Sequence, residues 1–252
     1  MRPRKRFGQH FLHDAGVLAR IVQALAPAPG DTVVEIGPGE GVLTRALLAR
    51  LPHLTAIEID RDLAARLAAE FPPERLTLHC ADALDFDFGA LGPGFRLVGN
   101  LPYNISTPLL FQVARHADRL RDAHFMLQRE VVDRMVAQPS TPDYGRLSVM
   151  LQVRFRMQRL FKVARGAFRP PPKVESALVR LVPLREPLAC DEAIFAAVVR
   201  GAFSARRKTL RNALRIEPED YIALQIDPML RPENLSPADY VRVALRVSSR
   251  TS

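Results

Sequence analysis

A polar amide and an aromatic ring come together in the run Asn100-Leu101-Pro102-Tyr103, directly after an apolar segment. The Asn100 side-chain oxygen and the Leu101 carbonyl oxygen can each accept one hydrogen of an exocyclic amine, and the Tyr103 ring can stack on a flat base. Pro102 keeps the intervening backbone extended. The run therefore predicts a site for the amino group of a nucleic-acid base. The alternative is an ordinary turn with a packed tyrosine.

A glycine-rich turn, Gly37-x-Gly39-x-Gly41, follows the apolar run 32–36 and precedes a stretch with helical apolar spacing. Glycine has no Cβ, so the backbone can approach a ligand closely, and the following helix offers free N–H groups. The spacing differs from the G-x-G-x-x-G of dinucleotide-binding folds. By itself the turn indicates either a ligand site or a tight turn without a ligand.

Two carboxylates at the ends of later β-type runs indicate which ligand the turn would hold. Glu58 lies 21 residues after Gly37, which suits an acid that accepts hydrogen bonds from ribose hydroxyls. Asp82 could accept from an adenine amine, or it could be a helix cap or a solvated loop residue. Acids beside the turn repel pyrophosphate, so we expect a nucleoside without phosphate, such as S-adenosylmethionine with its cationic sulfonium.

These residues need a scaffold that brings the ends of several strands together. Short β-type runs alternate with stretches of helical period, which is typical of an α/β fold with a doubly wound, mostly parallel sheet. Asp14 is the expected cap of a first helix that covers residues 18–25. We predict seven strands with the last pair antiparallel, at residues 32–36, 54–58, 75–79, 95–99, 122–128, 148–163 and 177–182.

The composition bounds the class of protein. The chain has 252 residues, of which 48% are hydrophobic, and this excludes an intrinsically disordered protein. No apolar run approaches the length of about 18 residues that a spanning helix needs, and the N-terminus lacks the apolar core of a secretory signal. Cys80 and Cys190 are too few for a disulfide framework. We therefore expect a cytoplasmic protein that does not bind a membrane.

The net charge of +9 is uneven along the chain. Residues 1–126 hold 14 basic and 14 acidic side chains, whereas residues 127–252 hold 22 and 13. The excess concentrates between Arg154 and Arg215, and a second basic cluster lies at residues 2–6. This asymmetry predicts contact with a polyanion by part of the molecule. Anionic lipid or a merely solvated basic surface would be the alternatives.

The composition changes at residues 183–187, after which β-type runs disappear. Ile194, Val198 and Ala202 share one face of an expected helix, and Leu235-Ser-Pro237 has the staple, cap and first-position proline of another. We therefore divide the chain into residues 1–186 and a small all-helical domain at residues 187–252.

Four motifs, in order along the chain, resemble those of the ribosomal RNA adenine dimethyltransferases. Asn100-Leu-Pro-Tyr103 is similar to the N-L-P-Y signature of amino-methylating enzymes, and Glu35-Ile-Gly-Pro-Gly-Glu-Gly-Val-Leu-Thr44 resembles motif I of the family. Gly8-Gln-His-Phe-Leu12 is similar to the family's G-Q-N-F-L, with His10 where Asn is common. Phe168-Arg-Pro-Pro-Pro-Lys-Val-Glu-Ser176 matches F-x-P-x-P-x-V-x-S. The resemblance implies a Rossmann-like, S-adenosylmethionine-dependent methyltransferase domain.

The resemblance also implies roles for individual residues. Asn100, Leu101, Pro102 and Tyr103 would act on the adenine, and Phe168 would complete an aromatic sandwich around it, unless it is a core residue before the proline run. The cofactor would be held by Gln9, His10, Leu12, Gly37, Gly39, Glu58, Ile59, Asp82, Ala83 and Asn100. The alternative for His10 is a surface residue. The histidines show no ligand spacing, so we expect no metal.

Two segments are similar to the small-subunit branch of that family, the KsgA type, rather than to the large-subunit branch that confers macrolide resistance. They are Ile105-Ser-Thr-Pro-Leu-Leu110 and Phe203-Ser-Ala-Arg-Arg-Lys-Thr-Leu-Arg-Asn-Ala-Leu214. In the second segment we expect RNA phosphates to contact Arg206, Arg207, Lys208 and Arg211, with Arg207 and Arg211 on one helix face and Leu210 and Leu214 toward the core.

The resemblance implies dimethylation of two adjacent adenines near the 3′ end of 16S ribosomal RNA during assembly of the 30S particle, by a monomer. Three alternatives stay open at this point. One is a relative recruited as a nucleic-acid-binding factor, which the intact run 100–103 disfavours. The others are a resistance methyltransferase and a small-molecule methyltransferase, and the latter would leave the charge asymmetry and the aromatic pair unexplained.

Overall fold

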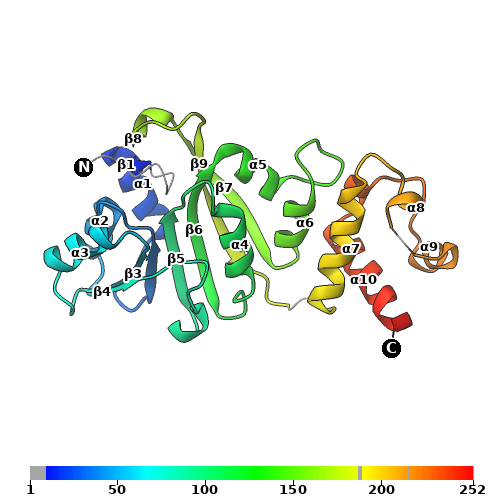
Figure 1. Ribbon diagram of the computed structural model, residues 1–252, viewed down its shortest axis with the longest axis horizontal. Coiled ribbons are helices and arrows are strands. Elements are labelled where there is room, and N and C mark those ends of the chain that lie inside the picture. Colours follow the sequence, from blue (N-terminus) through cyan, green and yellow to red (C-terminus); the bar gives the residue numbers. More distant parts are fainter. Residues whose placement is uncertain (1–9, 187–188, 215, 252) are drawn as a thin grey trace. The chain divides into compact units, whose positions relative to one another are not determined.

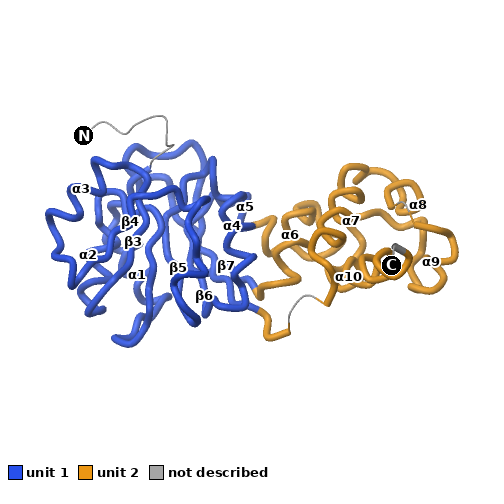
Figure 2. Tube along the Cα trace, turned by 60° about the horizontal axis from the view of Figure 1, so that its bottom comes forward, with its two compact units in different colours: residues 1–132, 157–183 blue, residues 133–156, 184–252 orange. Residues whose placement is uncertain are grey.

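The computed structural model describes residues 10–186, 189–214 and 216–251, and it divides the chain into two compact units (Figure 2). Unit 1 comprises residues 1–132 and 157–183, and unit 2 comprises residues 133–156 and 184–252. The second unit begins at residue 184 and also takes in residues 133–156. The domain boundary expected after residue 186 stays a prediction. None of the helices in the described part of the chain is both long and apolar enough to cross a membrane.

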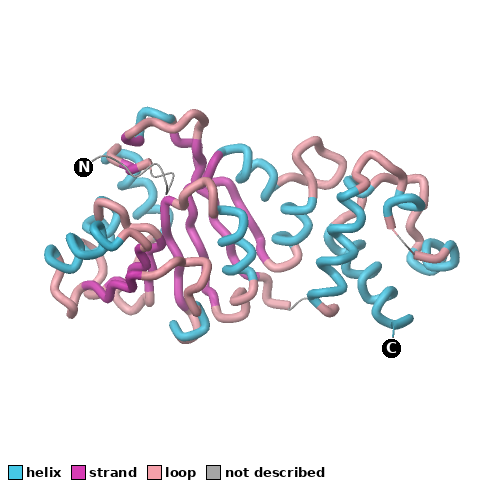
Figure 3. Tube along the Cα trace, viewed as in Figure 1, coloured by secondary structure: helices cyan, strands magenta, loops and turns pink. Residues whose placement is uncertain are grey.

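A seven-stranded sheet forms the centre of unit 1, with the strands in the order β4-β3-β2-β5-β6-β9-β7 (Figures 1 and 3). β2 pairs in parallel with both β3 and β5, while β6 and β9 are antiparallel. The predicted seven-stranded, mostly parallel sheet is therefore confirmed, and its antiparallel pair is formed by β6 and β9. The strands are β2 (Val33–Ile36), β3 (Leu54–Glu58), β4 (Leu76–Cys80), β5 (Phe95–Asn100), β6 (Leu120–Gln128), β7 (Phe155–Val163) and β9 (Ser176–Pro183).

The strand order reverses at β2, and this reversal decides where a ligand can bind. The chain proceeds from β2 outward to β3 and β4, and then returns to the other side of β2 with β5 and β6. Connections that leave in opposite directions open a crevice beyond the carboxyl ends of the two central strands. The glycine turn follows β2 and Asn100 ends β5, so the topology brings these two motifs to the same edge of the sheet.

One face of the sheet is covered by helices whose apolar stripes the sequence predicts. In α1 (Ala15–Leu25), Asp14 caps the first turn by accepting from the Val17 N–H, and Leu18, Ile21, Val22 and Leu25 are buried. These residues join α2 (Val42–Leu48) and the sheet in one continuous core cluster. The remaining helices of this part of the chain are α3 (Arg61–Glu70), α4 (Ser106–Ala114) and α5 (Arg129–Val136), which extends into unit 2.

The prediction of a strand over residues 148–163 is wrong for its first part. Residues 146–152 form α6 (Arg146–Gln152), and β7 begins only at Phe155. The Ser148 hydroxyl accepts from the Gly145 N–H and donates to the Arg134 carbonyl, and the Gln152 amide donates to two further carbonyls of the preceding segment. These contacts with residues before the run favour the helix, and alternating apolar and basic residues could not indicate them.

Unit 2 is built from helices around a separate core, which also includes Tyr144 and Val149. Besides α6, its helices are α7 (Glu192–Ser204), α8 (Leu210–Ala213), α9 (Pro218–Leu224) and α10 (Pro237–Thr251). The two helices expected at 194–202 and from Pro237 are confirmed. Ser236 and Asp239 form reciprocal capping bonds at the start of α10.

The basic run 206–211 does not lie on one helix, contrary to the expectation. α7 ends at Ser204, residues 205–209 are not helical, and α8 has four residues. Arg207 and Arg211 therefore do not share a helix face. Leu210 and Leu214 are buried as expected, and the Leu210 and Arg211 N–H groups bond to the Leu230 and Pro228 carbonyls.

Candidate functional site

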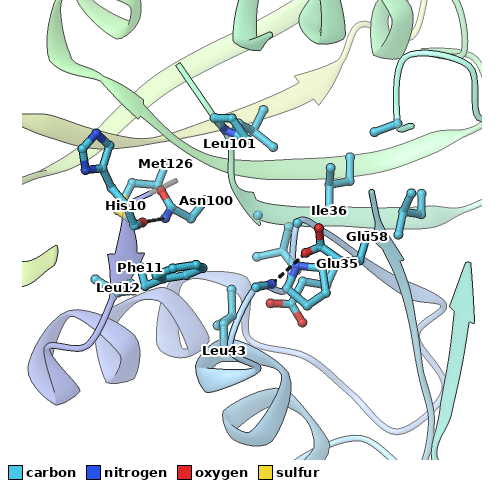
Figure 4. Close-up of a pocket in the computed structure, with 18 of the residues that line it drawn as sticks. His10, Phe11, Leu12, Glu35, Ile36, Leu43, Glu58, Asn100, Leu101 and Met126 are labelled. Atoms are coloured by element: carbon cyan, nitrogen blue, oxygen red, sulfur yellow. Dashed lines mark hydrogen bonds between the residues drawn. The ribbon is translucent and has the colours of Figure 1, made fainter. Parts of the chain in front are cut away.

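A cavity opens at the reversal point of the sheet, entirely within unit 1 (Figure 4). Its lining comes from the glycine turn after β2, the ends of β3, β4 and β5, and an N-terminal segment that includes β1 (Phe11–Leu12). The cavity contains most of the residues that the sequence singles out: His10, Leu12, Gly37, Gly39, Glu58, Ile59, Asp82, Ala83 and Asn100 through Tyr103. Separate motifs in the sequence therefore form one site.

The glycine turn takes a backbone conformation that residues with a Cβ rarely adopt. Gly37, Gly39 and Gly41 have φ angles of 68°, 58° and 78°. A Cβ on Gly39 would lie 3.0 Å from the Phe11 ring, and one on Gly41 would lie 2.6 Å from the Leu67 side chain. The turn thus depends on glycine both for its φ angles and for its close packing.

Glu58 holds the glycine turn in place from the end of β3. One carboxylate oxygen accepts from the Gly39 N–H at 3.0 Å, and the other accepts from the Asp60 N–H at 2.9 Å. Burial raises the pKa of the Glu58 carboxyl, while these backbone hydrogen bonds oppose the rise. Each carboxylate oxygen has a further lone pair, so Glu58 can organise the turn and still accept from a ribose hydroxyl.

The ends of β3 and β4 add one apolar surface and one acid to the cavity. Ile59 is 43% exposed although it lines the cavity, which leaves an apolar side chain for a flat ring to cover. One oxygen of Asp82 accepts from the Leu84 N–H at 2.9 Å, and Ala83 beside it is buried. Asp82 is therefore a turn residue and a cavity carboxylate at once.

The charge of the cavity suits a cationic ligand. Glu40, Glu58 and Asp82 all line it, and no lysine or arginine of the described residues does. A ligand phosphate would meet carboxylates without a compensating cation. The sulfonium and nucleoside of S-adenosylmethionine fit this donor set, with acids for the ribose and glycine backbone for close approach. The described residues also bring no group of three or more His, Cys, Asp and Glu together for a metal ion.

Asn100 stands at the junction of the cavity and the N-terminal segment. Its side-chain Nδ2 donates to the His10 main-chain oxygen at 2.8 Å (Figure 4). A Cβ on Gly37 would lie 3.9 Å from the Asn100 main-chain oxygen, so the glycine turn and Asn100 are neighbours. Because Nδ2 is bonded to a carbonyl, Oδ1 is the atom of the amide that remains to accept a hydrogen bond.

The next three residues also line the cavity, as predicted. Leu101 is buried, and its N–H bonds to the Met126 carbonyl, which holds the backbone beside β6. The Tyr103 hydroxyl lies 2.7 Å from the Ser176 hydroxyl, and burial raises the pKa of the Tyr103 phenol. The ring is thus fixed by a neutral hydrogen bond at its far end.

The structure differs from the expectation for Phe168. Phe168 belongs to β8 (Phe168–Arg169), is 2% exposed and packs in the core of unit 1, and it does not line the cavity. Its pairing with Leu12 across the β1–β8 ladder turns the side chain into that core. This arrangement corresponds to the alternative that Phe168 is a core residue before the proline run. A sandwich of the base between Tyr103 and Phe168 would require the Phe168 ring to move.

The N-terminal motif is described only from His10 onward, and Gln9 lies outside the described residues. His10 and Leu12 line the cavity, and the His10 ring centroid lies 5.5 Å from that of Tyr103. Phe11 also lines the cavity and contacts the glycine turn. Sequence reasoning missed Phe11, although its place within the G-Q-H-F-L run was an available signal.

Glu35 is a second cavity residue that the prediction did not include as a site residue. It is 2% exposed, and the Thr44 hydroxyl donates to its carboxyl group at 2.7 Å. Burial raises the pKa of the Glu35 carboxyl to about 8, and the nearby Glu58 charge adds to the rise. A glutamate inside an otherwise apolar strand was the available signal.

Glu35→Gln should remove a pH dependence of stability. Because the Glu35 pKa is raised in the folded protein, its contribution is fully present below the unfolded value near 4.5 and is lost as the pH rises through about 8. Urea unfolding at pH 5 and pH 9 should show wild type losing on the order of a few kcal/mol relative to E35Q. Glu40→Gln, an exposed neighbour, is the control. Parallel curves for wild type and E35Q would contradict the shift.

The four basic residues expected to bind RNA lie in unit 2, but they are not equivalent. The Arg206 guanidinium donates to the Glu233 carboxylate at 2.7 Å and to the Pro142 carbonyl at 2.8 Å, so it joins segments of the unit. Arg207, Lys208 and Arg211 are exposed. The geometry therefore divides the predicted cluster into one structural arginine and three exposed cations.

Nearly the whole chain is similar to known proteins of one family. A family model described as "Ribosomal RNA adenine dimethylase" matches residues 1–248. The curated "Ribosomal RNA small subunit methyltransferase A" of Thiobacillus denitrificans is 62% identical over 252 residues, covering 98% of this chain and 99% of that protein. The protein of the same name from Aromatoleum aromaticum is 59% identical over 254 residues, covering 99% of this chain and 96% of its own.

Two solved structures share the arrangement of the chain over nearly its full length. A dimethyladenosine transferase from Plasmodium falciparum superimposes with a TM-score of 0.85 at 25% identity, covering 96% of this chain and 98% of that one. The 23S rRNA methyltransferase ErmE gives a TM-score of 0.72 at 29% identity, covering 94% and 99%. The fold predicted from the sequence is thereby confirmed.

Proposed function

This chain belongs to the ribosomal RNA adenine dimethylase family, and from that premise we propose that it dimethylates adenine N6 atoms in small-subunit ribosomal RNA. It is an S-adenosylmethionine-dependent rRNA adenine dimethyltransferase. The target is 16S ribosomal RNA, at two adjacent adenines near its 3′ end, in a partly assembled 30S particle. We propose a cytoplasmic enzyme that acts as a monomer.

The orientation of the Asn100 carboxamide is the observation that carries the proposal. Nδ2 bonds to the His10 carbonyl, so Oδ1 is left as the atom of the amide that can accept from a substrate. An adenine amine offers two hydrogens, and Oδ1 together with the Leu101 carbonyl can accept both. A cavity that carries acids and glycine backbone for a nucleoside cofactor lies directly beside this amide.

The chain's residues act by positioning and by charge. S-adenosylmethionine, when bound, supplies a methyl group on a sulfonium. The adenine amino nitrogen is a weak nucleophile because its lone pair is delocalised into the ring. When Asn100 and Leu101 accept its hydrogens, the lone pair is freed to point toward the methyl group, and the same oxygens stabilise the positive charge that develops. Holding the two reactants in this geometry can supply roughly 7 to 11 kcal/mol.

The degree of similarity favours the small subunit over the large one. The two curated small-subunit relatives are 62% and 59% identical to this chain, whereas the 23S enzyme is 29% identical. The alternative, a large-subunit resistance enzyme, shares the fold and the cavity type, so only the RNA substrate separates the two. The same identities disfavour a small-molecule methyltransferase and a binding factor without activity.

The direct test is methylation of purified ribosomal particles. The protein is incubated with labelled S-adenosylmethionine and unmodified small subunits, and the RNA is digested and analysed for dimethyladenosine. We expect label in small-subunit RNA only, at two adjacent adenines near the 3′ end. Label in large-subunit RNA would support the resistance alternative, and no dimethyladenosine in either would refute the assignment.

The exposed cations of unit 2 should control the salt dependence of RNA binding. Removing the charges of Arg207, Lys208 and Arg211 together should lower the slope of log affinity against log salt by about 2 to 3, since each lost phosphate contact removes roughly 0.7 to 0.9. Affinity for small-subunit RNA is measured between about 50 and 200 mM salt. The control removes the exposed charges of Arg50, Arg61 and Arg66 in unit 1. An unchanged slope in the first variant would place the phosphate contacts elsewhere.

A further inference from the structure

We propose that the N-terminal segment of residues 10–13, here called the strap, holds the Asn100 carboxamide in the orientation that methyl transfer needs, with His10 as the positioning residue. This inference rests on the proposed function, because it assigns a task within that reaction. The task is separate from cofactor binding. It concerns which atom of Asn100 faces the base, and it is decided by a segment 90 positions away in the chain.

The direction of the hydrogen bond between the strap and Asn100 follows from the chemistry of the two groups. The acceptor is the His10 main-chain oxygen, and a carbonyl oxygen cannot donate. Asn100 can therefore satisfy it only with Nδ2, at 2.8 Å, and rotation of the amide by 180° would place two oxygens against each other. With Nδ2 engaged, Oδ1 is on the other side of the amide. A base amine needs an acceptor there. A flipped Asn100 amide would instead place its own N–H groups against the N–H groups of the base.

Several contacts fix the strap where this bond can form. The His10 Nδ1 lies 2.8 Å from the Pro170 carbonyl, which requires that Nδ1 carry the proton, and the His10 ring lies against Tyr103 with centroids 5.5 Å apart. Leu12 is 7% exposed in the core of unit 1, and the His13 N–H bonds to the Ala167 carbonyl at 3.0 Å. The strap is thus tied to the segment 167–170 along its length, and strand β1 pairs with β8 there.

The strap also reaches the cofactor side of the cavity. The Phe11 ring lies against Gly39, where an added Cβ would be 3.0 Å from two ring carbons, and Phe11 lines the cavity beside the glycine turn (Figure 4). One residue of the strap therefore contacts the glycine turn, and the residue before it fixes the catalytic amide. A displaced strap changes both, so a correctly seated glycine turn and a correctly turned Asn100 occur together.

The first test observes the Asn100 amide directly and needs no substrate. The chain has four asparagines, so selective ¹⁵N-asparagine labelling yields four side-chain NH₂ signals, and Asn100→Ala assigns one of them. In wild type we expect the hydrogens of the Asn100 NH₂ group to exchange with water about tenfold more slowly than those of a free carboxamide. This ratio corresponds to the free energy of one ordinary hydrogen bond. His10→Gly removes both contacts of the ring and should abolish this protection.

His13→Gly is the matched control for that measurement. It makes the same substitution in the same strap, but the His13 side chain is exposed and its backbone bond to Ala167 is kept, so protection of Asn100 should persist. An unprotected Asn100 amide in wild type, or protection that survives His10→Gly, would overturn the proposal. Chemical shifts of the other three asparagines report whether each variant is folded.

The second test uses the pH dependence of an altered amide. Asn100→Asp retains an acceptor for the base but has no proton for the His10 carbonyl when it is ionised. Its turnover at saturating S-adenosylmethionine should therefore rise as the pH falls, because the protonated carboxyl group can again donate to the His10 carbonyl. We expect a rise of at least about tenfold relative to wild type, which corresponds to one ordinary hydrogen bond. A pH profile for N100D parallel to wild type would count against a role for the donated bond.

The kinetics of His10→Gly separate positioning from cofactor binding. We expect kcat to fall about 10- to 100-fold, the cost of a small misplacement at a reacting centre, with a smaller change in the Kd for S-adenosylmethionine. A change in Kd alone would assign the strap to the cofactor only. If wild type fails to methylate RNA while its Asn100 amide is protected, the proposed function fails and the strap contact stands, so the two failures are distinguishable.

Discussion

Asn100→Ala is expected to lower the turnover of adenine methylation by at least about two orders of magnitude, the usual effect of losing one preorganised group at a developing charge. The affinity for S-adenosylmethionine should stay within a fewfold. The physical reason is that Oδ1 contacts the base amine as positive charge forms on it. The glycine turn and the acids proposed to hold the cofactor, Glu58 and Asp82, lie on other strand ends and keep their contacts.

Single-turnover kinetics with small-subunit particles and calorimetric titration of the cofactor measure the two quantities separately. Gln23→Ala is the control, since it removes an exposed carboxamide of the same unit on α1. Equal losses in turnover and cofactor affinity for Asn100→Ala would show that Asn100 supports the cavity rather than the reaction. Unchanged turnover would remove Asn100 from the mechanism.

Gly99→Ala is expected to destabilise unit 1 by about 3 kcal/mol or more, at or beyond the upper end for overpacked interiors. A Cβ on Gly99 would lie 2.4 Å from the Ile36 main-chain oxygen, a distance that real Cβ atoms do not show. The neighbouring atom belongs to the backbone of the next strand, so neither strand can yield by changing a rotamer. The strands β2 and β5 must separate where the glycine turn and Asn100 meet.

Thermal unfolding followed by circular dichroism tests this, with an expected fall in Tm of about 6 to 12 °C. Because Asn100 follows directly, turnover should fall as well at temperatures where the variant stays folded. Gly166→Ala is the control, since an added Cβ there meets nothing within 4 Å. A Tm for G99A within about 2 °C of wild type would mean that the strands accommodate the methyl group.

The motifs that the sequence predicted correctly depend on residues close together in the chain. The Asp14 cap bonds to Val17 three residues on, and the glycine turn connects a strand to the helix that follows it. Periodicity places apolar residues such as Leu18 and Leu25 in the core of unit 1. In an open parallel sheet, ligands bind beyond the carboxyl ends of the strands, and Gly37 and Asn100 both lie at that edge. The location of the cavity could therefore be predicted.

The errors concern segments whose structure depends on distant partners. Residues 148–152 are helical because Ser148 and Gln152 bond to carbonyls 14 to 17 residues earlier. Arg206, one of four apparently similar cations, is taken up by Glu233, 27 positions away. Phe168 enters the core because its strand pairs with the N-terminal segment. Periodicity and composition carry no information on these pairings.

The sequence by itself determined the family, the fold class, the cofactor type and most of the residues gathered at the cavity, because local backbone preferences and short motifs encode them. Only the tertiary structure decided the state of individual groups: which atom of the Asn100 amide bonds to the His10 carbonyl, why the Glu35 pKa is about 8, and which cations stay exposed. Hydrogen-bond direction, desolvation and ion pairing depend on distances between atoms that lie far apart along the chain, and folding alone sets those distances.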